Sequence, residues 1–111
     1  MKYQPYVYNA TIDSIYDGDT ITVTLALGFG IELKKQKIRL LGIDTPEIRG
    51  GEREEGLKSK ARLVELIEGK EITLVTHKNK TGKYGRWLGT IYVNETNINE
   101  QLIQEGFARP Y

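Results

Sequence analysis

The sequence contains no cysteine and only one histidine, His77. Without cysteine the chain cannot form disulfide bonds or thiolate metal sites, and a single histidine cannot supply a histidine-rich zinc cluster. The lack of cysteine does not indicate a cellular compartment, because a domain that needs no disulfide folds equally well inside or outside the cell.

Long apolar runs are also missing. The longest apolar stretches are only a few residues long, far short of the ~20 needed to span a bilayer, so we expect no membrane association. Residues 1–5 lack the apolar segment of a secretory signal. We therefore expect either an intracellular protein or a secreted protein that has lost its leader.

The chain has three prolines, no internal repeat and no linker rich in proline or serine, which favours one domain over residues 1–111. A chain of this length buries roughly 65% of the surface that it exposes when unfolded. A hydrophobic core is therefore possible without disulfides or a structural metal.

The charges almost cancel, with 16 Lys and Arg against 15 Asp and Glu and a net charge of +1. That balance argues against a generally basic binder of polyanions. The charges are unevenly placed, however, because residues 72–94 contain four basic residues and no acidic one, while acidic residues gather in two short turns. We expect a basic cleft around an acidic pocket.

Five runs rich in alternating or β-branched residues predict strands at residues 6–16, 20–27, 32–43, 71–77 and 86–94. Gly28, Phe29 and Gly30 predict a hairpin turn between the second and third strands. This pattern predicts a mainly β fold with some α-helix: a five-stranded barrel of the oligonucleotide-binding type (OB-fold), with one helix inserted after the third strand and one near the C-terminus.

The inserted helix is predicted from apolar residues that share one helical face, followed by Gly69 as the end signal: Leu57, Ala61, Val64 and Ile67. The second helix is predicted to start at Asn97, whose side chain can cap it together with Glu100, and to end at Gly106.

Two turns are rich in carboxylates: Asp17-Gly18-Asp19-Thr20 and Asp44-Thr45-Pro46-Glu47. Either turn alone is best explained as a solvated turn in which aspartate caps main-chain amides. Together they can offer oxygen ligands from Asp19, Asp44 and the main-chain carbonyl of Thr45. An all-oxygen set suits calcium or magnesium, with water completing the coordination shell.

Two arginines are candidates for binding phosphate. Arg39 lies within an apolar strand, and Arg86 ends a turn-rich segment before the fifth strand. Each is explained equally well as an exposed surface residue. A guanidinium group, however, matches two phosphate oxygens in a way that lysine cannot, and two arginines, a metal and a carboxylate around one phosphodiester make a hydrolytic site.

The order of these motifs is more specific than any one of them. Asp-Gly-Asp-Thr comes first, then Arg-Leu before Asp-Thr-Pro-Glu, then Lys-Tyr-Gly-Arg at residues 83–86. In this order the sequence resembles the staphylococcal (thermonuclease-like) nuclease family over most of residues 7–109.

The resemblance implies an OB-fold barrel and a calcium-dependent phosphodiesterase, with magnesium less expected, that acts on DNA and RNA and leaves 3′-phosphate and 5′-hydroxyl ends. It assigns calcium binding to Asp19, Asp44 and the Thr45 carbonyl. It assigns catalysis to Arg39, Glu47 and Arg86, with Glu47 as general base or water-orienting group. It assigns nucleotide binding to Lys83, Tyr84 and Tyr111.

Two other interpretations remain open. A barrel of this type can bind nucleic acid or protein without cutting it, and the chain can be a structural domain that keeps the same residues as ion pairs. For the nuclease we expect a DNA or RNA substrate that is preferably single-stranded, and a monomer as the default state.

Overall fold

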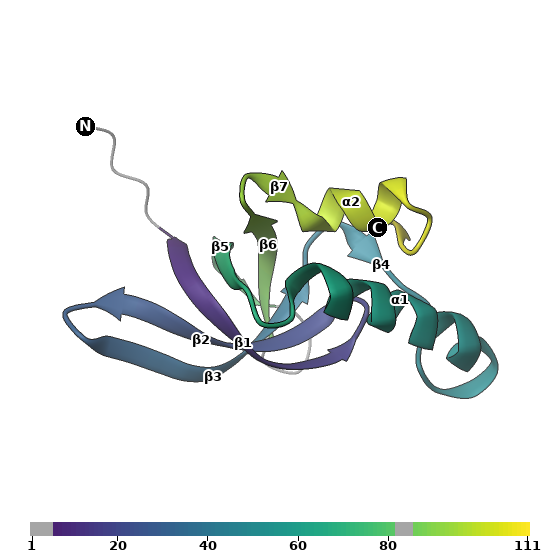
Figure 1. Cartoon of the computed structure of the whole chain (residues 1–111), viewed down its shortest axis with the longest axis horizontal. Helices are drawn as coiled ribbons and strands as arrows, with labels where there is room; N and C mark the ends of the chain where they lie inside the picture. The colour runs from purple at the N-terminus through teal and green to yellow at the C-terminus, as the bar shows by residue number, and fades with distance from the viewer. Residues whose placement is uncertain (1–5, 82–85) are drawn as a thin grey trace.

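The computed structural model describes residues 6–81 and 86–111, apart from the side chains of residues 78–81. Five long strands form its centre: β1 (Val7–Asp17), β2 (Thr20–Gly28), β3 (Ile31–Leu40), β5 (Glu71–Thr81) and β6 (Trp87–Val93). Figure 1 shows the β2–β3 hairpin reaching beyond the rest of the molecule. The hairpin turn falls at Phe29-Gly30, as predicted.

These strands close into a barrel. They pair antiparallel in the order β3-β2-β1-β5-β6, and β3 then pairs with β6 in parallel, where Ile38 to Leu40 face Trp87 to Gly89. Gly89 suits this close packing, because a Cβ atom there would lie 3.1 Å from an Ile38 methyl carbon of β3 and 2.8 Å from a Leu74 methyl carbon of β5. The predicted five-stranded OB-fold barrel is confirmed.

The remaining elements are β4 (Ile43–Asp44), η1 (Gly50–Glu52), α1 (Arg53–Ile67), β7 (Thr96–Asn97), α2 (Ile98–Gln104) and β8 (Arg109–Pro110). The predicted third strand, 32–43, was too long at its C-terminal end. It breaks at Gly42, whose φ of 80° is outside the β region, and β4 begins after that turn to pair with β8.

The core consists of fully buried aliphatic side chains from the barrel strands and both helices. Among them are Ile21, Val23, Ile38, Leu40, Leu63, Ile67, Leu74, Ile91 and Leu102. Burial of such side chains is the main favourable contribution to folding, and here it fixes the strands that carry the candidate site.

The predicted buried face of the first helix was right at Ile67, which is fully buried, and wrong at Leu57 and Ala61, which are exposed. Leu57 is 40% exposed, and the side of α1 that faces the protein carries Gly56, Ser59, Leu63 and Ile67. The reason is close approach: a methyl group at Gly56 would collide with the main-chain carbonyl of Glu47. At the N-terminal end of this helix, small residues rather than hydrophobic ones therefore mark the face that contacts the protein.

The other helix signals are confirmed. The Asn97 side chain accepts a hydrogen bond from the Glu100 amide at 3.0 Å and caps α2. Gly69, with a φ of 74°, follows the C-terminal end of α1. Neither helix in the described ranges has the length and apolar character needed to cross a membrane.

Candidate active site

The turn between β1 and β2 places two carboxylates at the end of the barrel. Asp17 and Asp19 are each only 6% exposed. Gly18 between them permits this burial, since a Cβ atom there would lie 2.9 Å from the Thr45 side chain. The Asp17 Oδ1 atom accepts a hydrogen bond from the Asp19 amide at 3.1 Å, which shapes the turn.

Asp19 connects this turn to the second acidic turn. Its Oδ2 atom accepts a hydrogen bond from the Thr45 amide at 3.1 Å, and its Oδ1 atom accepts one from the Thr20 hydroxyl at 3.2 Å. The two carboxylate-rich turns, 26 residues apart in sequence, are therefore in direct contact. Thr45 is itself buried, and among the described residues its hydroxyl oxygen has no hydrogen-bond partner.

Arg39 lies between the two turns, near the end of β3. Its Nη1 atom donates to the main-chain carbonyls of Leu40 at 3.1 Å and Ile43 at 3.0 Å. The same guanidinium lies 3.3 Å from Asp19 Oδ2 and 3.6 Å from Asp44 Oδ1, and its side chain is 14% exposed. Main-chain acceptors and two carboxylates thus fix both the position and the plane of this group.

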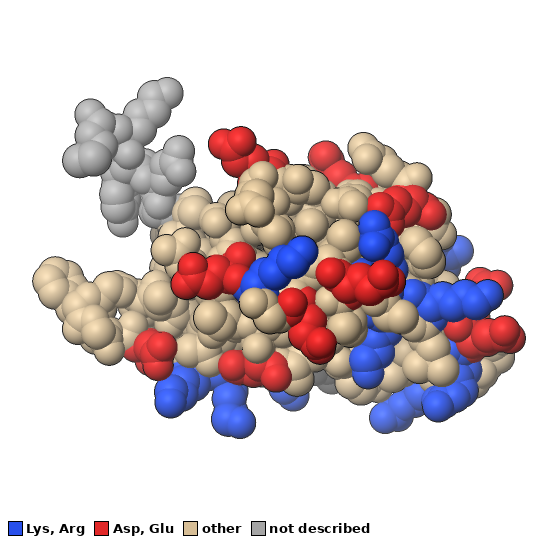
Figure 2. All heavy atoms as spheres, viewed as in Figure 1, with Lys and Arg blue, Asp and Glu red and all other residues tan. Residues whose placement is uncertain are grey.

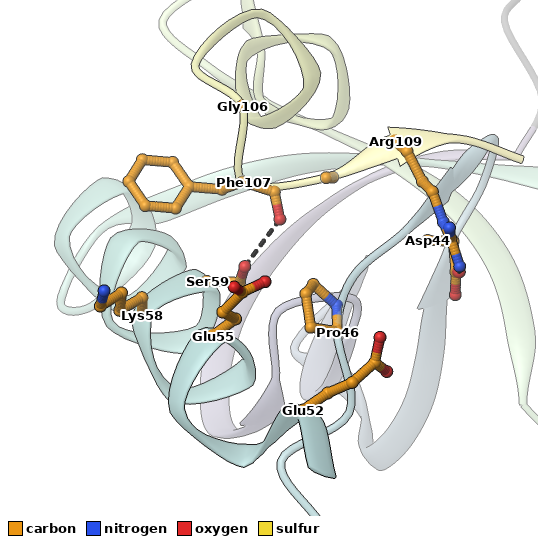
Figure 3. Close-up of a pocket in the computed structure, with 10 residues that line it drawn as sticks. Asp44, Pro46, Glu52, Glu55, Lys58, Ser59, Gly106, Phe107 and Arg109 are labelled. Atoms are coloured by element: carbon orange, nitrogen blue, oxygen red, sulfur yellow. Dashed lines mark hydrogen bonds and ion pairs between the residues drawn. The ribbon is translucent and has the colours of Figure 1, made fainter.

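Asp44 has a second cationic partner that the sequence patterns did not single out. Arg109 in β8 contacts Asp44 Oδ2 through Nε at 3.3 Å and Nη2 at 3.2 Å. Figure 3 shows the two side chains side by side on their paired short strands. Only the pairing of β4 with β8 brings them together, so no local pattern indicates this contact.

Arg86 reaches the same turn from the other side. Its Nη1 atom donates to the Thr20 hydroxyl at 3.3 Å, and that hydroxyl in turn donates to Asp19. Arg39 in β3 therefore contacts Asp19 directly, whereas Arg86, which precedes β6, reaches it through the Thr20 hydroxyl.

The remaining predicted site residues lie nearby or outside the described residues. Glu47 is exposed, and its amide donates to a Glu52 carboxylate oxygen at 3.4 Å. The Tyr111 ring centroid lies 5.8 Å from the Arg39 guanidinium carbon, and the Tyr111 amide donates to the Gly42 carbonyl at 3.0 Å. Lys83 and Tyr84 lie outside the described residues.

The pKa of the Asp17 carboxyl is raised by its surroundings. Burial is the largest cause that raises the pKa of Asp17 from 3.8 to about 6, followed by the side-chain interaction and charge repulsion with Asp19 and by the charge of Glu47. The hydrogen bond from the Asp19 amide acts in the opposite direction and lowers this pKa. The negative charge of Glu47 therefore acts on the same cluster, although its side chain is exposed.

The oxygen atoms of this cluster fit a hard divalent cation. The Asp19 and Asp44 carboxylates both contact the Arg39 guanidinium, through Nη1 and Nη2 respectively, so both lie beside the same positively charged group. Over residues 6–81 and 86–111, no group of three or more His, Cys, Asp or Glu side chains is placed to hold a metal ion. A cation here would have two carboxylates and would complete its shell with neutral oxygens, an arrangement that calcium accepts readily.

A hollow of about 500 Å³ opens beside Asp44, between α1 and the segment around Phe107. Figure 3 shows Glu52, Glu55 and Lys58 at its rim, with the Ser59 hydroxyl donating to the Phe107 carbonyl at 2.6 Å. Figure 2 shows acidic and basic side chains intermixed over the face viewed in Figure 1. On this face, therefore, neither sign of charge predominates.

Comparison with known proteins agrees with this geometry. Residues 37–111 match the model of the family described as staphylococcal nuclease homologue. That range includes Arg39, Asp44, Glu47 and Arg86, whereas Asp19 lies before it.

Several relatives carry nuclease names. The chain is 34% identical over 112 residues to endonuclease YncB of Bacillus subtilis, covering 97% of this chain and 50% of YncB. It is 33% identical to the SPbeta prophage-derived endonuclease YokF of the same species, covering 91% of this chain and 33% of YokF. It is 36% identical to the probable staphylococcal-like nuclease CAN2 of Oryza sativa, covering 68% of this chain and 19% of CAN2. The chain thus spans half or less of the length of these relatives.

Proposed function

The chain belongs to the staphylococcal nuclease homologue family, and from this premise we propose that it is a calcium-dependent nuclease. It hydrolyses phosphodiester bonds of DNA and RNA, preferably single-stranded, and leaves 3′-phosphate and 5′-hydroxyl ends. The observation that carries the proposal is the placement of Arg39 between Asp19 and Asp44, with Arg86 linked to the same turn through Thr20.

Arg39 and Arg86 bind the scissile phosphate and stabilise the additional negative charge that develops as water attacks phosphorus. Support comes from the anchoring of Arg39 Nη1 on two main-chain carbonyls, at 3.1 and 3.0 Å. A guanidinium held in this way needs little reorganisation during the reaction, which is the condition under which such groups contribute most to catalysis.

Asp19, Asp44 and the Thr45 carbonyl hold the calcium ion. When bound, the ion would act as a Lewis acid that polarises the phosphate and lowers the pKa of a water molecule bound to it. Calcium is favoured over magnesium because it accepts six to eight oxygens in irregular geometry, whereas magnesium requires a near-ideal octahedron. The contacts of Arg109 with Asp44 Oδ2, at 3.2 and 3.3 Å, keep the orientation of that carboxylate fixed.

Glu47 orients the attacking water and accepts its proton. The P–O5′ bond breaks, and the departing 5′ oxygen takes up a proton to become a hydroxyl group. This role agrees with the exposure of Glu47, which gives solvent access to the carboxylate, and with the influence of its charge on the pKa of Asp17.

The experiment compares purified wild type with Arg39→Lys and Glu47→Gln on a labelled single-stranded oligonucleotide in calcium. We expect each variant to cut about 100-fold more slowly or worse, because each loses a group that acts on the transition state. Arg62→Lys and Glu65→Gln are matched controls on α1, and they should cut like wild type.

The ends of the products test the direction of cleavage. A 3′-phosphate prevents extension by a polymerase until a phosphatase removes it, so we expect extension only after phosphatase treatment. Rates near wild type for both site variants would remove Arg39 and Glu47 from the mechanism. A folded protein that binds the oligonucleotide but never cuts it would instead show a binding module.

A further inference from the structure

A second hollow is lined by Arg86 but not by Asp44, and it is not used by the reaction described above. It measures about 580 Å³ and is lined by residues of β1, β2, β3 and α1, including Tyr16, Lys37 and Lys60. Thr20 and Arg86 also line it, and they are joined by the hydrogen bond that links Arg86 to Asp19. We call this hollow the Lys60 groove; it is continuous with the candidate active site.

The charge of the Lys60 groove has one sign. Three cationic side chains, Lys37, Lys60 and Arg86, line it, and none of its described lining residues is acidic. The hollow beside Asp44 differs, because Asp44, Glu52 and Glu55 all line it. In a chain with a net charge of only +1, this grouping favours an anionic occupant of the Lys60 groove.

The groove also presents an aromatic ring. Tyr16 is 47% exposed although it lies on a central strand of the barrel, and the half-buried Ile15 and Ile48 line the same hollow. Proteins that bind single-stranded nucleic acid combine cationic side chains for the backbone with exposed aromatic rings on which bases stack. The volume lies within the range of pockets that enclose small organic ligands.

We propose that the Lys60 groove binds the nucleotide next to the scissile phosphate in a single-stranded substrate. Lys37 and Lys60 contact the backbone phosphate of that nucleotide, and the Tyr16 ring stacks on its base. The inference rests on the proposed nuclease function. The groove would let the enzyme hold the nucleic-acid strand on both sides of the cleavage point. The nucleotides that extend past Arg86 into the groove would then contribute to affinity.

The test is binding of a fluorescent single-stranded ten-nucleotide DNA, measured by anisotropy with chelator present so that no cleavage is needed. We expect Tyr16→Ala to weaken binding about tenfold, as loss of one stacked base does. We expect Lys60→Gln to lower the slope of log affinity against log salt by about 0.7, the value for one phosphate contact on a single strand.

Two variants serve as controls. Lys58→Gln removes a cation on α1 that lines the hollow beside Asp44, and Phe29→Ala removes a fully exposed ring at the tip of the β2–β3 hairpin. We expect both to bind like wild type. Thermal melts of all four variants establish that each is folded.

Cleavage then separates the two proposals. With calcium, we expect Tyr16→Ala to raise KM for the same single-stranded ten-nucleotide DNA while kcat stays within about twofold of wild type. If wild type binds the oligonucleotide and the Tyr16 and Lys60 variants bind it equally well, the groove proposal is overturned even where cleavage is normal. If the variants lose binding but no protein cuts, the groove is a binding site for single-stranded DNA, and the nuclease proposal and the groove's place beside a scissile phosphate both fail.

Discussion

Asp17→Asn is expected to stabilise the protein at neutral and alkaline pH. The Asp17 carboxyl is 6% exposed and lies beside Asp19. Burial first, and then the neighbouring acids, raise its pKa from 3.8 to about 6. The ionised form is therefore unfavourable in the folded protein, and asparagine removes the charge while keeping an Oδ1 atom that accepts from the Asp19 amide.

The pKa shift determines both the sign and the size of the effect. Between pH 3.8 and about 6 the folded protein binds more protons at Asp17 than the unfolded chain does. The free energy of unfolding therefore falls as the pH rises through this window, and the penalty is constant above it. At 1.36 kcal/mol for each pKa unit, the penalty at pH 8 is at most about 3 kcal/mol.

Urea unfolding of wild type and Asp17→Asn from pH 4 to pH 8, with chelator present, measures this penalty. We expect Asp17→Asn to gain up to about 3 kcal/mol at pH 8 and to lose most of that gain near pH 4. Glu32→Gln, an exposed acid in the hairpin, is the control and should show no such trend. Equal stability at pH 8, or a gain that grows as the pH falls, would refute the reasoning.

Two further substitutions test how packing and hydrogen bonds of the two helices support the site. Gly56→Ala should lower the free energy of unfolding by about 1–3 kcal/mol and slow cleavage, because the new methyl group pushes against the main chain of Glu47; urea unfolding and the cleavage rate measure the two effects. Asn99→Ala should cost about 3 kcal/mol, because the buried Asn99 amide bonds three main-chain groups that would lose their partner. A loss under about 1 kcal/mol in urea unfolding would mean that water replaces those bonds.

Local patterns predicted the strands well, because alternation along a strand reflects which face is buried. Asn97 and Gly69 likewise marked a helix start and a helix end through local hydrogen-bond chemistry. The face of α1 was predicted wrongly at its N-terminal end, since the close packing of Gly56 against the Glu47 main chain depends on how the preceding loop folds back onto the helix. The barrel closure at Gly89 could not be predicted from local patterns either, because it depends on the pairing of β6 with β3.

In the candidate site, too, some residues could be predicted from the sequence and others could not. The ordered motifs indicated Asp19, Arg39 and Asp44, and the structure brings these three into contact. Arg109 was missed, because its contact with Asp44 requires β8 to pair with β4. Asp17 was visible in the first acidic turn, but its raised pKa depends on burial, which residue types alone do not reveal.

We propose above that Asp19 and Asp44 hold a calcium ion that hydrolysis requires. The most direct measurement is the initial rate of cleavage of a single-stranded oligonucleotide as calcium is added to chelated wild-type protein. We predict no cleavage in chelator, a saturable rise in rate with free calcium, and loss of that rise in Asp44→Asn. Cleavage that persists at full rate in chelator, or no cleavage at any calcium concentration, would contradict the account.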